Sequence, residues 1–195
     1  MKGRHEILVL LAAMLLAFHP SSESESMNPQ NPSPCVSALR ALVEGRLDAW
    51  HGLPTGCSRQ DAEAAFGAGD TGPDGVASLA GTLTAFRRYA RSADLPRDVQ
   101  VWLRDDAIFG VEVNDLQPAQ SVAHMLGAPE ASERSGVGGV HTQRIYAARG
   151  LVLHVQNITG AIVRSYGFTP CTLAQFRELP WGQIRIERRP IRSPR

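Results

Sequence analysis

The most reactive side chains of the sequence belong to three cysteines, Cys35, Cys57 and Cys171. Cys57 stands just before a predicted helix start, where the helix dipole favours a thiolate, and His51 is near enough in sequence to serve as a base. A nucleophilic Cys57 is therefore one hypothesis. The alternative is structural, because three thiols allow at most one internal disulfide, between any two of them, and leave one thiol free.

Histidines and carboxylates do not show metal-site spacing. After the N-terminal segment the histidines are His51, His124, His141 and His154. None of them has a second histidine four residues away, and none lies near a Cys pair at zinc-finger spacing. Asp70, Asp74, Asp105 and Asp106 do not have the spacing of a calcium-binding loop. We interpret them as turn residues, because Asp accepts backbone hydrogen bonds in tight turns. We predict no metal, no cofactor and no enzymatic activity.

Large aromatic and cationic side chains are better candidates, because protein interfaces favour Trp, Tyr and Arg. The alternation from Val99 to Arg104 puts Trp102 on the face opposite the aliphatic residues. If that face is open, Trp102 contacts a protein partner; if helices cover it, Trp102 belongs to the core. The residues that we expect on a binding surface are Trp102, Arg104, Arg88, Arg144 and His154.

The charge of the chain is nearly balanced, with 20 Lys and Arg against 19 Asp and Glu. This balance gives no overall field that would attract a nucleic acid. Five of the arginines form a basic C-terminal end: Arg185, Arg188, Arg189, Arg192 and Arg195. We interpret them as a solvated terminus or as a weak contact with anionic polymers of the cell envelope.

The N-terminal segment has the pattern of a secretion signal. Lys2 and Arg4 precede an apolar run at residues 7–18, which is too short for a membrane-spanning helix, and small residues at 22–26 fit a cleavage site. An uncleaved N-terminal anchor is the alternative. We therefore predict an exported protein, periplasmic or secreted, with no transmembrane segment after cleavage.

Periodicity predicts a helix, a second helix and a sheet in the first half of the remaining chain. Apolar residues recur at helical spacing over 36–50, and Ser58 with Asp61 resembles a capping box for a short helix ending at Phe66. A strand at residues 84–91 follows. Residues 98–104 and 107–114 alternate on both sides of Asp105 and Asp106, which predicts a hairpin.

The second half shows the same order of elements. We predict a short helix at residues 118–126, a strand at 142–149, and a hairpin formed by 151–156 and 161–168. Thr172 with Gln175 marks a further helix that Pro180 ends. Residues 183–188 alternate as an edge strand would.

The two halves also align segment by segment. The matched pairs are residues 65–69 with 125–129, 84–91 with 142–149, 99–104 with 151–156, and 107–109 with 161–163. Their common order indicates an internal repeat of one helix-and-sheet unit.

Several short motifs carry a resemblance to known proteins. Leu126-Gly127-Ala128-Pro129, Arg144-Ile145-Tyr146 and residues 151–166 resemble the unit shared by β-lactamase inhibitor protein and the outer-membrane assembly lipoproteins of the BamE (SmpA/OmlA) type. The resemblance covers about residues 56–168 and implies a helix packed on an antiparallel sheet, in tandem. The first unit lacks the motif's proline, and β-lactamase inhibition is not carried over.

These observations predict an α+β fold of two tandem helix-plus-antiparallel-sheet units with flanking helices. The expected boundaries are a signal peptide at 1–26, a linker at 27–34, units at 35–115 and 116–188, and a basic tail at 189–195. We expect a non-enzymatic protein that binds another protein through its sheet face. The alternatives are an envelope enzyme that uses Cys57 or carboxylates, and a structural envelope component.

Overall fold

The computed structural model describes residues 31–70, 74–116, 124–136 and 140–183. The chain divides into two units, Met1–Asn31 and Pro32–Arg195, and all described helices and strands belong to the second. The signal peptide, most of the linker, nearly all of the strand expected at 183–188 and the basic tail lie outside the described residues. Of the helix expected at 118–126, only residues 124–126 are described, and they are helical.

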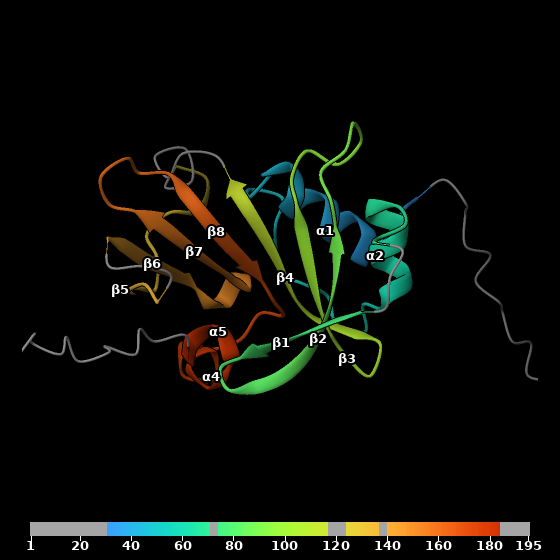
Figure 1. The fold of residues 1–195 in the computed structure, drawn as a ribbon. Helices are drawn as coiled ribbons and strands as arrows, with labels where there is room; N and C mark the ends of the chain where they lie inside the picture. Colours follow the sequence, from blue (N-terminus) through green and yellow to red (C-terminus); the bar gives the residue numbers. More distant parts are fainter. Residues whose placement is uncertain (1–30, 71–73, 117–123, 137–139, 184–195) are drawn as a thin grey trace, which may run out of the picture. The chain divides into compact units, whose positions relative to one another are not determined.

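The centre of the fold is one antiparallel sheet (Figure 1). Its strands are β1 (Gly75–Leu79), β2 (Thr82–Tyr89), β3 (Val99–Arg104), β4 (Ala107–Leu116), β5 (Ala131–Arg134), β6 (His141–Tyr146), β7 (Leu151–Gln156) and β8 (Ile162–Gly167). The order across the sheet is β1-β2-β3-β4-β8-β7-β6-β5. Two meanders of consecutive strands therefore meet where β4 pairs with β8. The predicted α+β class is confirmed.

The first face of the sheet packs against α1 (Pro34–Glu44) and α2 (Arg59–Phe66). The alternating residues Val99, Val101 and Leu103 of β3 point to this side, as the sequence predicts. Leu39, Leu42 and other buried residues of α1 meet them there. Burial of this apolar surface is the main stabilising contribution of the first layer.

The second face is covered in part by α4 (Leu173–Glu178) and α5 (Pro180–Gln183). Trp181 is fully buried, stacks on Tyr166 with ring centroids 4.9 Å apart, and stacks on Phe109 at 5.6 Å. Its ring also lies over Gly110, where any side chain would collide with it. Phe176 of α4 packs on Phe168, with ring centroids 5.4 Å apart, and both belong to the buried apolar cluster that Trp181 shares with Ile145 and Val152. Polar side chains occupy the part of this face near β2, β3 and β4.

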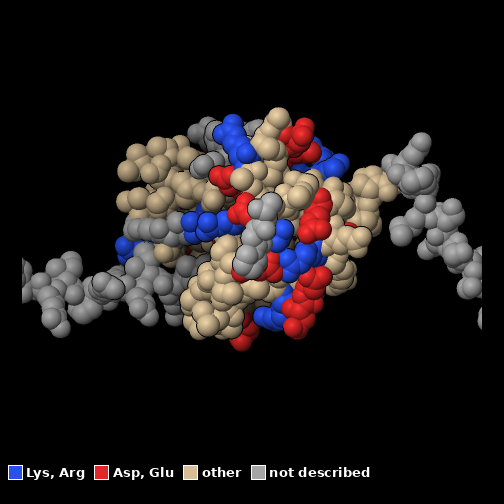
Figure 2. Space-filling model, turned by 45° about the vertical axis from the view of Figure 1, so that its right-hand side comes forward, with Lys and Arg blue, Asp and Glu red and all other residues tan. Residues whose placement is uncertain are grey.

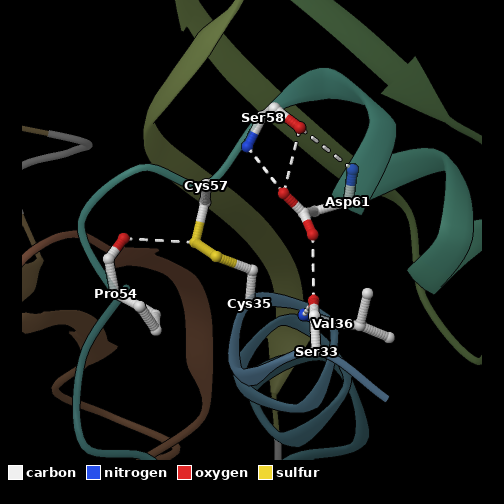
Figure 3. Close-up of a disulfide and its surroundings, with 7 residues drawn as sticks. All are labelled: Ser33, Cys35, Val36, Pro54, Cys57, Ser58 and Asp61. Carbon is white, nitrogen blue, oxygen red and sulfur yellow. Dashed lines mark hydrogen bonds between the residues drawn. A yellow bond between two sulfur atoms is a disulfide. The ribbon is translucent and has the colours of Figure 1, made fainter. Parts of the chain in front are cut away.

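A disulfide joins Cys35 of α1 to Cys57 ahead of α2, with the Cα atoms 5.5 Å apart (Figure 3). Ser58 caps α2 in the predicted capping box with Asp61, whose carboxylate also accepts a hydrogen bond from the Ser33 hydroxyl at 2.9 Å. One carboxylate therefore connects both helix starts beside the disulfide. Cys171 is free and half-buried. Of the three pairings that the sequence left open, the structure therefore has Cys35–Cys57.

The structure corrects several expected boundaries. β1 and β5 are strands that the sequence analysis did not predict. The expected helix over 36–50 ends at Glu44, and the next residue, Gly45, adopts a left-handed conformation. α4 ends at Glu178, just before Pro180 as predicted, but Pro180 then begins a further short helix, α5, which was not expected. A bulge in β4 between the pairs Trp102–Gly110 and Leu103–Ile108 interrupts the expected alternation, so that Ile108 joins the first face.

Candidate binding face

A polar hollow of about 450 Å³ lies on the uncovered part of the second sheet face. The strand register places the residues of its floor in adjacent rows: Arg88, Gln100 and Glu112 in one, Asn114 and Arg164 in the next. Because these residues come from β2, β3, β4 and β8, the hollow spans the junction of the two meanders. Asp70 and Asp98 also line it.

The centre of the hollow is an ion pair between β4 and β8. The Nε of Arg164 lies 3.1 Å from Oε1 of Glu112, whose residue is only 8% exposed. Burial raises the pKa of Glu112, and the positive charge of Arg164 counters only part of this increase. Arg164 also donates a hydrogen bond to the Tyr166 hydroxyl at 3.3 Å. This pair fixes the polar floor between the two meanders.

The side of the hollow near β2 offers groups for a ligand. The guanidinium of Arg88 is exposed and lies over the Phe86 ring, 5.2 Å from its centroid. Gln100 and Asn114 are half-exposed, and their amides can both donate and accept hydrogen bonds. A fixed cation beside two amides suits recognition of peptide carbonyls and carboxylates.

Two of the five predicted binding residues are buried. Trp102 is 4% exposed, with its ring 6.0 Å from that of Trp181, so the alternative in which helices cover this residue is the one observed. His154 is fully buried, and its Nδ1 lies 2.6 Å from the Ser135 hydroxyl. Neither side chain can contact a partner in this conformation.

The other three predicted residues lie at separate places. Arg88 lines the hollow. Arg104 is exposed on the same face beyond Trp102, over the Phe109 ring, and therefore lies away from the hollow. Arg144 pairs with Leu153, which belongs to the core under α1, so it lies on the opposite face. Of the five predicted binding residues, Arg88 is therefore the one that lies at the hollow.

Sequence reasoning missed Gln100, Glu112, Asn114 and Arg164. The alternation in the hairpin did place Gln100, Glu112 and Asn114 on its polar face, and that signal could have selected them. Arg164 lies 52 positions from Glu112, and no local pattern shows that β8 pairs with β4. This long-range pairing is what turns a polar strand face into a hollow.

Figure 2 shows acidic and basic side chains interspersed along one part of the face that it draws.

A larger hollow, of about 600 Å³, lies on the helix side between the ends of α1 and α2. There Arg40 donates hydrogen bonds to the carbonyls of Ala64 and Ala65, which caps the last turn of α2. The Arg40 guanidinium in this larger hollow is therefore already used to cap α2. The hollow on the sheet, where the guanidinium of Arg88 is exposed, is the better candidate for a binding site.

The described residues offer little for covalent chemistry. Cys57 is bonded to Cys35 and has no thiolate, so the hypothesis of a nucleophilic Cys57 is wrong for this oxidised state. In the described part of the chain, no three His, Cys, Asp or Glu side chains gather as a metal site would require. The hydroxyl of Ser135 meets His154, but both residues are fully buried.

Comparisons with known proteins found no relative of this chain. No family model, curated protein or solved structure matches the chain. Among the helices of the described residues, none has the length and apolar character needed to cross a bilayer.

Proposed function

We propose that this chain is an exported protein that binds another protein through the polar hollow on its second sheet face. The observation that carries the proposal is the row of Arg88, Gln100 and Glu112, over which no described helix packs, whereas α4 and α5 cover the neighbouring Trp102. Arg88 and Gln100 of this row remain accessible. A partner loop could place backbone carbonyls or a carboxylate against the Arg88 guanidinium and the Gln100 amide.

Export is supported by the signal-like N-terminal segment and by the Cys35–Cys57 disulfide, because such bonds persist in oxidising compartments. The tandem arrangement is supported by the sheet order, in which β1–β4 and β5–β8 each form a meander that follows a helical segment. This arrangement agrees with the proposed likeness to the inhibitor and lipoprotein unit. A ligand site at the junction of two units would draw residues from both, as the hollow does.

The proposal predicts that substitutions in the hollow release a partner. The tagged mature protein is used to capture a specific partner from envelope and culture-medium fractions, and its affinity is then measured by calorimetry. Arg88→Ala and Gln100→Ala each weaken binding by about tenfold or more, because each removes a hydrogen-bonding group that the partner would otherwise satisfy.

Arg134→Ala is the matched control, since Arg134 is an exposed cation on β5. It leaves the affinity unchanged. A partner that binds wild type, Arg88→Ala and Gln100→Ala equally well would show that the hollow is not the binding site.

A further inference from the structure

The two outer strands of the sheet differ in how they are protected. β5 carries the exposed charged residues Glu133 and Arg134. β1 has the sequence Gly-Val-Ala-Ser-Leu, with no charge, no proline and a regular register against β2. Charges, prolines and bulges are the features that keep an edge strand from pairing with another chain. In the described residues, β1 is thus the edge left open to pairing.

Two exposed aliphatic side chains lie on the hairpin formed by β1 and β2. Val76 is 63% exposed and Leu83 is 78% exposed. The register pairs Val76 with Ala85 and Ser78 with Leu83, so that all four side chains point to one side of the hairpin. Exposed aliphatic side chains beside an open edge strand mark a contact surface more strongly than either feature alone.

We propose that β1 pairs with β1 of a second copy of this chain, antiparallel and centred on Ala77. A two-fold axis at Ala77 sets Val76 opposite the partner's Ser78, and the partner's Val76 becomes its diagonal neighbour. Ser78 is small, so Leu83 can reach over it toward the partner's Val76. This two-fold arrangement therefore gives the unpaired backbone groups of β1 hydrogen-bonding partners and covers both Val76 and Leu83.

A second copy fits this edge because the edge complements itself. No charged side chain of β1 has to lose water when the strands pair. Asp74, next to the strand, is already held by Arg59, with Arg87 at 3.5 Å, so it adds no uncompensated charge. Five residues of pairing make a small interface, which predicts a reversible dimer with a dissociation constant on the order of 100 µM.

Sedimentation velocity from about 10 µM to 1 mM tests the pairing. The wild type is expected to shift from monomer to dimer, whereas Val76→Lys and Leu83→Lys each remain monomeric. In Val76→Lys the two introduced charges are diagonal neighbours across the axis, and in Leu83→Lys each charge replaces the aliphatic side chain that would cover the partner's Val76. Both positions are exposed, and thermal unfolding checks that each variant stays folded. Ile158→Lys is the control, since Ile158 is equally exposed on the turn between β7 and β8 and should leave the dimer intact.

Two results would overturn the proposal. One is a wild-type protein that stays monomeric throughout the concentration range. The other is a dimer that survives Val76→Lys and Leu83→Lys, which would place the contact elsewhere. Neither result bears on the hollow, because Arg88 and Gln100 are not part of the β1 edge.

Discussion

At the scale of single residues, His154 is the buried group with the largest consequence. It is fully enclosed on the second sheet face, and burial, with help from the positive charges of Arg164 and His141, lowers its pKa to about 4. Its neutral ring shares a hydrogen bond with Ser135. The residue that the sequence suggested for binding is therefore a neutral part of the core.

This pKa predicts a loss of stability in acid. In the unfolded chain His154 takes up a proton near pH 6.5, whereas the folded chain resists protonation until about pH 4. The unfolded state thus binds more protons in this window, and the free energy of unfolding falls as the pH drops from about 6.5 to 4. We expect His154 to account for about 2 kcal/mol of loss between pH 7 and pH 4.5.

Urea unfolding of wild type and His154→Gln at both pH values measures this contribution. The variant is less stable at pH 7, because it replaces a packed ring, but its stability should depend less on pH by about 2 kcal/mol. Equal pH dependence in the two proteins would show that His154 is not held neutral.

At the scale of elements, the docking of α4 and α5 depends on the contact between Trp181 and Gly110. We predict that Gly110→Ala destabilises the protein by about 1–3 kcal/mol, because its methyl group would overlap the indole. Near-ultraviolet circular dichroism and urea unfolding report the change. Trp181→Phe removes part of the overlapping ring, so the loss caused by Gly110→Ala should be smaller in that background. Additive losses would mean that the two residues are not coupled.

The elements also show what the sequence can and cannot reveal. The capping residues Ser58 and Thr172 and the alternation in β3 predict local structure well, because the interactions lie within a few residues. β1 and β5 carry few large side chains, so only their pairing with β2 and β6 makes them strands. The coverage of Trp102 depends on Trp181, which is distant in sequence. The hollow likewise depends on the pairing of β4 with β8.

At the scale of the whole molecule, the disulfide holds α1 to the segment that leads into α2 across a separation of 22 residues. Closing a loop of this length is expected to contribute about 3 kcal/mol, chiefly by restricting the unfolded chain. We predict that Cys35→Ser with Cys57→Ser lowers the free energy of unfolding by about this amount. Cys171→Ser, the control, should change it by less than about 1 kcal/mol. Similar losses of unfolding free energy in the double variant and in Cys171→Ser would contradict a stabilising disulfide between Cys35 and Cys57.

The most direct test of the central claim is site-specific photo-crosslinking from the hollow. A photoreactive side chain is placed at Gln100 in the exported protein, and at Ile158 as an exposed control outside the hollow. The account predicts one discrete crosslinked protein from position 100, which Arg88→Ala reduces, and none of that species from position 158. A partner that crosslinks from position 158 and not from position 100 would contradict the assignment of the polar hollow as the binding site.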